Sequence, residues 1–370
     1  MIHRITTNGM MNSYKANLMQ SYNTLANVSE KVTTQRNFNS YAEDPAKASQ
    51  AFQLRRNRWN TENQIANSKQ VVHKFQQAWD CMEMTYQDLG VKLAKYSSLR
   101  AENGADYSGR AALGEVIRGA AKSVVETMNA KYGENFVFSG ADGQNVPFSM
   151  DPDGTVRYRG YDVTTGLDAQ GNGDPNVFQD MIDNEHTYVD LGMGMKEDAN
   201  GKIIPSSAFD SALIGVEAIG FGTNEVTLND GVTKVTVPKN VISIMKEMGD
   251  LYAACSPENG TFSPDSDGWT KYGNNVTPDQ WAEALEIQMN QSLDDLHAQF
   301  VSLDTEATYL KSNQDRLTSL DDSLNEQVVD IEDIAPAEAI TSLMWAQYSY
   351  NAALRIGMNI LSQSLIDYMN

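Results

Sequence analysis

A stripe of positions spaced three and four residues apart is the feature that most constrains this chain. It spans fourteen positions, most of them apolar: Ala51, Leu54, Arg58, Thr61, Ile65, Ser68, Val72, Phe75, Trp79, Met82, Tyr86, Leu89, Leu93 and Tyr96. This spacing places them all along one seam of a coiled-coil-like helix. Such a helix would be ~70 Å long at about 1.5 Å per residue. An ordinary globular core cannot cover that length, so the stripe needs other long helices as partners.

Similar stripes occur at both ends of the chain. The first helical segment, residues 10–34, carries Met11, Tyr14, Leu18, Ser21, Leu25, Val28 and Val32. A second long stripe runs from Leu296 to Val328. The last one carries Ile340, Leu343, Gln347, Tyr350, Leu354, Gly357, Leu361, Leu365 and Tyr368. We therefore expect the two ends of the chain to pair as antiparallel helices in one long rod.

Proline, glycine and turn-forming residues separate these helices. Asp44 and Pro45 predict a helix start, because a carboxylate accepts backbone N–H groups and proline suits the first helical position. Asn103-Gly104 ends the long stripe. A shorter helix fits residues 110–132, where Gly and Ala would allow close helix approach, and Gly133 is predicted to follow its C-terminus. Helices are also expected at residues 241–254 and from Thr277-Pro278-Asp279 onward, with an interruption at Ala335-Pro336.

The middle of the chain has the pattern of β-structure. Asp151-Pro-Asp-Gly154 and Asn-Asp-Gly231 each lie between strand-like runs, which predicts two hairpins. Pro238 would end the second of them. The predicted fold class is α+β: a long antiparallel coiled-coil-like helical rod from both chain ends, with a mostly β outer domain inserted in the middle. The predicted divisions are residues 1–44, 45–134, 135–240, 241–334 and 335–370.

Charge and missing motifs exclude several classes of function. The chain has 28 Lys and Arg against 49 Asp and Glu, a formal charge of −21, which argues against binding nucleic acid or an anionic membrane surface. No run approaches the ~20 apolar residues of a membrane span, and no secretory signal is expected at the N-terminus. Phosphate loops, nucleophile elbows and metal-ligand spacings are missing, so we expect no enzyme and no cofactor. Cys81 and Cys255 are expected to be free thiols.

Two terminal segments resemble the flagellin family. Arg36-Asn-Phe-Asn-Ser-Tyr-Ala-Glu-Asp44-Pro45-Ala46 is similar to the segment that links the first two helices of that family. Leu361-Ser-Gln-Ser-Leu-Ile-Asp-Tyr368 is similar to its closing helix. The resemblance carries over to the linking-motif residues Arg36, Asn39, Ser40, Ala42, Asp44, Pro45 and Ala46. Within the family, the chain is most similar to members that join hook to filament. This similarity lies in residues 133–148, in residues 188–195 followed by 209–212, and in residues 364–368.

The resemblance implies a structural protein of the bacterial flagellum that acts outside the cell, at the junction of hook and filament. Such proteins leave the cell through the flagellar type III export channel, without a cleaved signal peptide. The implied partners are other axial proteins, namely hook-associated protein 1, flagellin or the filament cap, and further copies of the chain. An export chaperone at the C-terminal helix is also implied. The filament flagellin itself is the alternative, and a coiled-coil binding or adhesive module is a more distant one.

The stripes suggest how such a protein would assemble. We expect Met11, Tyr14, Leu18, Leu25, Val28 and Val32 of the first helix to face the last helix. On that helix the expected assembly residues are Ile340, Leu343, Tyr350, Leu354, Leu361, Leu365 and Tyr368. Burial against neighbouring copies would contribute about 25 cal/mol per Å² before the cost of ordering. The basic cluster at residues 55–58 could pair with acidic residues 321–322 or 332–333, although a solvated face is the favoured reading.

Overall fold

The computed structural model describes residues 7–102, 107–253 and 277–369, without the side chains of residues 7, 8, 107 and 360–369. It divides into two compact units. The first unit comprises residues 1–63 and 317–370, and the second comprises residues 64–316. Two helices, α2 (Pro45–Glu83) and α8 (Pro278–Glu332), contribute to both units.

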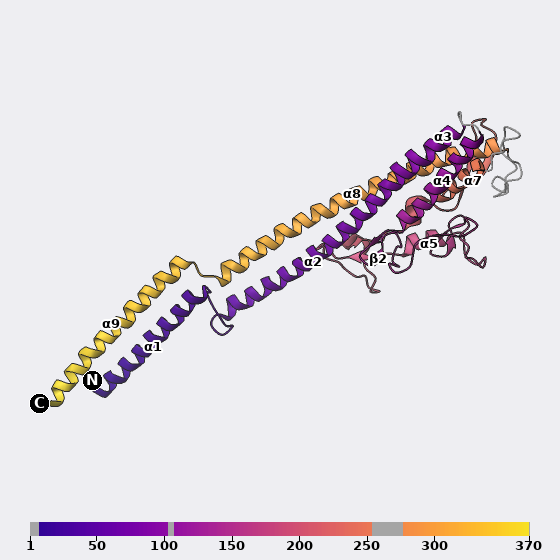
Figure 1. Ribbon diagram of the computed structural model, residues 1–370. Helices are drawn as coiled ribbons and strands as arrows, with labels where there is room; N and C mark the ends of the chain where they lie inside the picture. The colour runs from indigo at the N-terminus through magenta and orange to yellow at the C-terminus, as the bar shows by residue number, and fades with distance from the viewer. Residues whose placement is uncertain (1–6, 103–106, 254–276, 370) are drawn as a thin grey trace. The chain divides into compact units, whose positions relative to one another are not determined.

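The first unit is built from helices of both chain ends. Helix α1 (Thr7–Thr34) lies beside α9 (Pro336–Met369), as Figure 1 shows. The pair is antiparallel, because Tyr14 near the start of α1 contacts Gly357 while Tyr22 lies 6.1 Å from Tyr350, ring centre to ring centre. The beginning of α2 and the end of α8 form a second antiparallel pair. The predicted pairing of the two chain ends is therefore confirmed.

The predicted helix starts use their own side chains as caps. A carboxylate oxygen of Asp44 accepts a hydrogen bond from the Lys47 N–H at 3.0 Å, and Pro45 is the first residue of α2. At the start of α8, the Thr277 hydroxyl accepts from the Gln280 N–H at 3.3 Å. The Gln280 side chain accepts from the Thr277 N–H at 3.0 Å in return. This reciprocal pair is a capping box, which satisfies two N–H groups that a helix start leaves open.

Helices form most of the core of the second unit. The α2 helix continues into a π-helical segment, η1 (Met84–Lys95), and then into α3 (Tyr96–Glu102). Helix α4 (Tyr107–Met128) packs on α7 (Val241–Ala253), whose side chains are buried on nearly every side. The two helices cross at glycines, since a Cβ on Gly114 would lie 2.6 Å from the Ala253 nitrogen and 2.8 Å from the Gly249 oxygen. The predicted close approach of this glycine-bearing helix is confirmed.

The π-helical segment changes which residues face the core. The sequence stripe predicts Leu93 and Tyr96 at the seam, but both are exposed, while Ala94 and Ser97 are buried. A π-turn contains more residues than an α-turn, because its hydrogen bonds run from i to i+5. A stripe extrapolated at α-helical spacing therefore leaves the seam within one or two turns. The prediction was wrong for these two residues for that reason.

Short antiparallel strands form four separate sheets among the described residues. The two predicted hairpins are confirmed as β3 (Phe148–Met150) with β4 (Val156–Tyr158), and β8 (Thr223–Thr227) with β9 (Lys234–Pro238). The other strands are β1 (Lys131–Tyr132), β2 (Asn135–Phe136), β5 (Tyr161–Asp162), β6 (Tyr188–Val189) and β7 (Phe209–Asp210). Gly133 lies in the turn between β1 and β2, with φ of 62°, and not beside the end of α4. Its positive φ suits a tight hairpin turn equally well, which is why sequence alone misplaced it.

The middle region is less regular than a mostly β domain. It contains a helix that the sequence did not predict, α5 (Val177–Asn184), together with α6 (Gly215–Ile219) and the 3₁₀ turn η2 (Pro205–Ser207). Aromatic side chains hold it together: the rings of Phe148 and Tyr158 pack at a tilt, 5.0 Å apart, and those of Tyr158 and Phe178 pack edge to face, 6.2 Å apart. The Tyr158 hydroxyl donates to the Phe138 carbonyl at 2.9 Å, so this buried polar group is satisfied. Strands this short depend on that shared core.

Candidate assembly surface

The seam between α1 and α9 combines large and small side chains. On α1 the six predicted positions, Met11, Tyr14, Leu18, Leu25, Val28 and Val32, are all half-buried. On α9 the seam consists of Ala339, Leu343, Ala346, Tyr350, Ala353 and Gly357, which are buried or half-buried. The ring of Tyr14 lies directly on Gly357, where a Cβ would leave it no space. Small residues on one helix thus make room for larger ones on the other.

The α9 seam is shifted from the predicted stripe. Leu343, Tyr350 and Gly357 belong to both, but Ala339, Ala346 and Ala353 occupy the seam where the stripe has the next residue in each case. Ile340, Gln347 and Leu354 are consequently exposed. The reason is steric, because alanine allows α1 to approach more closely than a branched side chain does. The predicted residues Leu361, Leu365 and Tyr368 are among the side chains that are not described.

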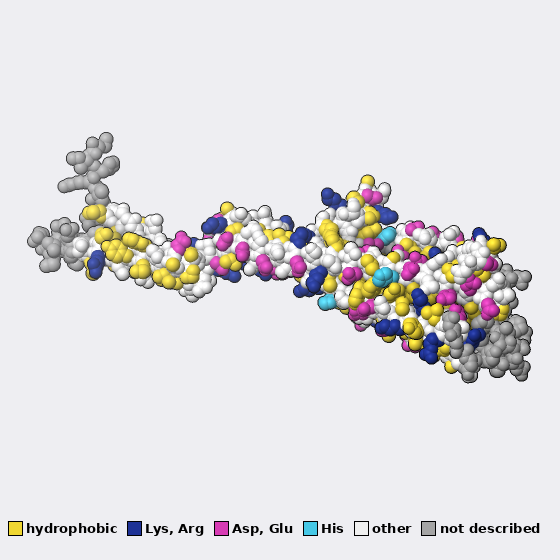
Figure 2. Space-filling model, turned by 90° about the horizontal axis from the view of Figure 1, so that it is seen from above, with side chains coloured by type: hydrophobic (Ala, Val, Ile, Leu, Met, Phe, Trp, Pro, Cys, Tyr) yellow, Lys and Arg dark blue, Asp and Glu magenta, His cyan; other side chains and the backbone are white. Residues whose placement is uncertain are grey.

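Several large apolar side chains are exposed on the described part of α9, outside the seam. Met344, Trp345, Tyr348 and Met358 are each between 65% and 69% exposed, and Ile340 and Ile356 are more than half exposed. Trp345 and Tyr348 contact each other edge to face at 6.3 Å. Figure 2 shows yellow side chains gathered over the α1–α9 pair. Exposing this much apolar surface is unfavourable by about 25 cal/mol per Å², and contiguous patches of this kind mark interaction sites.

The same pair is poor in charge. Helix α1 has three Lys or Glu among 28 residues, and α9 has three charged residues among 34, whereas α8 has fifteen among 55. A groove of about 600 Å³ between α1 and α9 is likewise lined by uncharged side chains: Asn17, Gln20, Ser21, Thr24, Val28, Ser342, Trp345, Ala346 and Ser349. Interface cores are depleted of charged residues, because an unpaired charge is costly to bury. This composition suits helices that become covered by other helices.

Two links beside the pair are joined to each other. The α1–α2 link (residues 35–44) runs against the α8–α9 link (residues 333–335), where the Asn37 N–H donates to the Glu332 carbonyl at 2.6 Å and the Ile334 N–H donates to the Gln35 carbonyl at 3.1 Å. The Asn37 side-chain amide also donates to the carbonyls of Ile331, at 3.1 Å, and Asp333, at 2.8 Å. Sequence reasoning missed Asn37. Its only signal was an asparagine among turn-forming residues, which does not reveal a partner almost 300 residues away.

The linking-motif residues hold the shape of the α1–α2 link. Asp44 and Pro45 begin α2, and Ala46 belongs to its first turn. The Asn39 N–H donates to the Glu43 carboxylate at 3.1 Å, and its side-chain amide donates to Glu30 at 3.0 Å. The remaining members are Arg36, which forms a β-bridge with Asp333, Ser40, whose carbonyl accepts from the Glu43 N–H at 3.2 Å, and the exposed Ala42.

Two of the three clustered arginines form ion pairs across the α2–α8 pair of the first unit. Arg55 pairs with Glu332. Arg58 bonds to Asp321 at 3.2 Å and to the Asn325 side-chain oxygen at 2.7 Å. The favoured prediction, that this cluster only faces solvent, was therefore wrong for Arg55 and Arg58. Part of each pair is shielded by the helices, which raises its value above that of a fully exposed pair.

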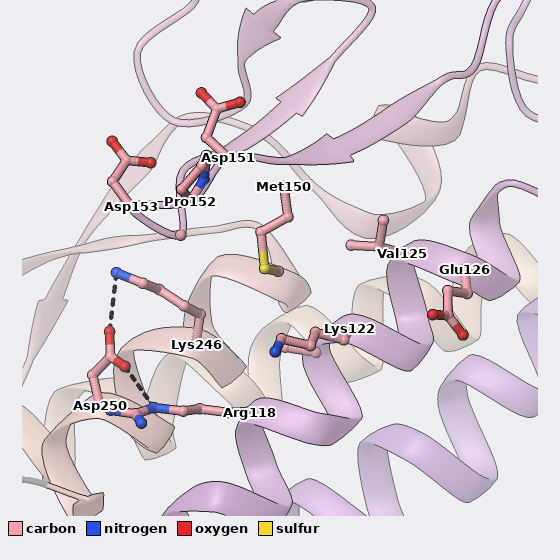
Figure 3. Close-up of a pocket in the computed structure, with 12 residues that line it drawn as sticks. Arg118, Lys122, Val125, Glu126, Met150, Asp151, Pro152, Asp153, Lys246 and Asp250 are labelled. Carbon is pink, nitrogen blue, oxygen red and sulfur yellow. Dashed lines mark hydrogen bonds and ion pairs between the residues drawn. The ribbon is translucent and has the colours of Figure 1, made fainter.

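The second unit contains a groove of about 540 Å³ between the β3–β4 hairpin and helices α4 and α7. Three of its charged groups bind one another, as Figure 3 shows: Asp250 accepts from Arg118 at 2.7 Å and from Lys246 at 3.0 Å. Lys122 and three further acids, Asp151, Asp153 and Glu126, also line the groove. Charges of both signs mixed in this way do not select an anion or a cation.

Within the described ranges, no group of His, Cys, Asp and Glu residues could hold a metal ion. Cys81 is a buried free thiol whose pKa is raised by burial, and Cys255 lies outside the residues that the structure describes. No helix in the described part of the chain has the length and apolar character needed to cross a membrane.

Comparisons with known proteins place the fold. No protein-family model and no curated protein matches the sequence. Among solved structures, the chain is similar to one from Vibrio parahaemolyticus described as a flagellar hook-associated protein. The TM-score is 0.51 at 14% identity, covering 79% of this chain and 100% of that one. FlgL of Bacillus cereus gives a TM-score of 0.43 at 16% identity, covering 75% of this chain and 99% of that one. A flagellar hook-associated protein-3 of Legionella pneumophila gives 0.46 at 12% identity, covering 75% and 98%. The Vibrio match shows that this chain shares its fold.

Proposed function

We propose that this chain is a structural component of the bacterial flagellum that joins hook to filament by packing its terminal helices against those of neighbouring axial proteins. The observation that carries the proposal is the charge-poor apolar surface that α9 presents beside α1, with Trp345 and Tyr348 at its middle. A chain with no partner would leave this surface in water. Supporting it are the linking motif and a fold shared with a flagellar hook-associated protein.

The finer parts of the proposal concern partners and location. The partners are hook-associated protein 1, flagellin or the filament cap, and further copies of the chain, whose helices would cover the α1–α9 pair. Before export, a chaperone covers α9, since an exposed stripe of this size promotes aggregation. The chain then leaves the cell through the flagellar type III channel and acts outside it. Its role is mechanical and requires no catalytic residue.

Immunogold electron microscopy of intact flagella tests the junction role. The antibody is raised against residues 141–240, which lie outside the terminal helices, and a strain lacking the protein serves as the control. Label confined to a band where hook meets filament is the expected result. Label along the whole filament would make the chain a flagellin. No label on the flagellum would overturn the flagellar role and favour a coiled-coil binding module.

A further inference from the structure

The first unit has two exposed stripes outside the α1–α9 pair. The basic-aromatic stripe consists of Phe52, Arg56 and Trp59 on α2, at i, i+4 and i+7, with Phe52 69% and Trp59 62% exposed. The acidic stripe consists of Asp322, Glu326 and Val329 on α8, at the same spacing, and is also exposed. Residues at these spacings lie along one side of a helix. Each stripe therefore forms a continuous strip of side chains facing solvent.

The two stripes have opposite charge. The segment of α2 in the first unit, residues 45–63, contains Lys47, Arg55, Arg56 and Arg58 against one acid, Glu62. The segment of α8 in that unit, residues 317–332, contains five acidic residues and no basic one. Arg55 and Arg58 are used inside the unit. Within the described residues, Arg56, Asp322 and Glu326 have no ion-pair partner, so charges of both signs remain available.

The stripes also stand at the same level of the helix pair. Arg58 bonds to Asn325 at 2.7 Å and to Asp321 at 3.2 Å, and Arg55 pairs with Glu332. In an antiparallel pair with these contacts, Arg56 is level with the turn of α8 that contains Glu326. Trp59 is level with the turn of Asp322. Two copies placed side by side with no shift along their helices would therefore have their stripes at the same level.

We propose that the partner of these stripes is a second copy of this chain, with the basic-aromatic stripe of one copy docked on the acidic stripe of the next. The contact uses different surfaces on the two copies, so it repeats from copy to copy and builds a ring or a helical array. Arginine and tryptophan carry much of the binding energy at protein interfaces, and complementary charge fixes their register. The inference rests on the proposed function, because it states how copies stand beside each other in the assembly.

Self-complementarity is the reason to prefer a second copy over another partner. The chain as a whole has a formal charge of −21, so two copies repel each other on average. A local contact between a basic and an acidic surface is needed to offset this repulsion and to align the copies. Stripes of opposite charge stand at matching height and with matching residue spacing on the two helices of one unit. A foreign partner would have to reproduce only one of the two stripes and would leave the other in solvent.

Charge reversal in the full-length chain tests the contact. The variants are Arg56→Glu, Glu326→Arg and the double variant, with Lys69→Glu and Asp304→Arg as controls that make the same charge changes at other exposed helix positions. Self-association is measured by sedimentation at about 0.15 M salt, where exposed charges are partly screened. Each single reversal is expected to weaken self-association at least tenfold. The double variant should recover it, because the two reversed charges again have opposite signs and attract each other across the contact. An equimolar mixture of the two single variants should also recover it, because alternating copies then place charges of opposite sign at every contact.

Three results would overturn the inference. The first is that the single reversals change self-association no more than their controls do. The second is that neither the double variant nor the mixture recovers self-association. The third is a wild-type chain that stays monomeric up to about 1 mM. The proposed function fails separately, through misplaced immunogold label. If the label lies at the junction but the charge reversals do not change self-association, the proposed contact is wrong and the proposed junction role is retained.

Discussion

At the scale of single residues, the space available to small side chains decides where helices approach. Gly114 and Gly249 allow α4 and α7 to cross almost in backbone contact. Gly357 provides the place where the Tyr14 ring lies on α9. None of these three glycines has a positive φ, so their role is steric and does not depend on unusual backbone conformation. Their substitution should therefore cost packing energy and not backbone strain.

Two glycines of α4 separate these effects. Gly114→Ala is expected to destabilise the chain by about 1–3 kcal/mol, because its methyl group would meet the backbone of α7. Gly119→Ala is the matched control, since a Cβ there meets nothing within 4 Å. It should instead stabilise by about 0.5–1 kcal/mol through helix propensity. Urea unfolding followed by circular dichroism measures both. Equal effects of the two substitutions would contradict the steric account.

Acidic residues of the second unit predict a pH dependence. Burial raises the pKa of Glu306, and the charges of Glu217 and Asp210 raise it further. The folded chain thus holds this proton more tightly than the unfolded chain, so stability is gained as pH falls towards the ordinary value of 4.5 and is lost as pH rises. Glu306→Gln should raise the urea midpoint at pH 7.5. The gain should shrink at pH 5, and a gain that is equal at both values would contradict the prediction.

At the scale of elements, the links and irregular segments between the helices have defined structures of their own. The α1–α2 link and the α8–α9 link are tied together by backbone hydrogen bonds and by the Asn37 side chain. The π-helical segment η1 moves the buried face onto Ala94 and Ser97. Both features alter the direction in which a long helical stripe points. An argument from uniform helical spacing fails at such places.

The joint between the links can be weakened at one side chain. Asn37→Ala removes two hydrogen bonds to carbonyls of the α8–α9 region and should cost about 1–2 kcal/mol. We expect faster proteolytic cleavage within residues 35–44, because the link opens more often. Asn23→Ala, at an exposed position of α1, should cleave at the wild-type rate. Unchanged cleavage of Asn37→Ala would mean that the backbone bonds alone hold the joint.

At the scale of the whole molecule, charge is distributed unevenly along the chain. The terminal helices are nearly uncharged and carry exposed apolar side chains, whereas α8 carries much of the acidic excess. Exposed apolar helices are suited to burial by neighbours, and acidic helices are suited to solvent or to ion pairs. The terminal helices therefore carry surfaces that are suited to burial by other helices.

Replacing the exposed aromatics of α9 separates assembly from stability. Trp345→Gln combined with Tyr348→Gln should change the free energy of unfolding by no more than about 0.5 kcal/mol, as is typical of surface substitutions. Both side chains are largely exposed. Incorporation into flagella should fall at least about tenfold, which corresponds to about 1.4 kcal/mol. Val232→Gln, which removes an 82% exposed apolar residue in the second unit, should incorporate normally. Normal incorporation of the double variant would contradict the assembly role of this surface.

Sequence reasoning succeeded where the signal was local. The caps of α2 and α8, both hairpins and the interruption before Pro336 follow from turn chemistry and proline geometry, which depend on a few neighbouring residues. The α1 stripe corresponds to the half-buried positions of that helix, because no break intervenes. Helix α5 was missed because eight residues give too little periodicity to recognise.

The sequence by itself determined that long amphipathic helices from both chain ends must find helical partners, since hydrophobic period and length are properties of the local chain. Only the tertiary structure decided which alanines and glycines form the α9 seam, that Asn37 joins two distant links, and that Arg55 and Arg58 find acids on α8. These choices depend on the position of a second helix hundreds of residues away. Residue spacing along one helix contains no information about that position.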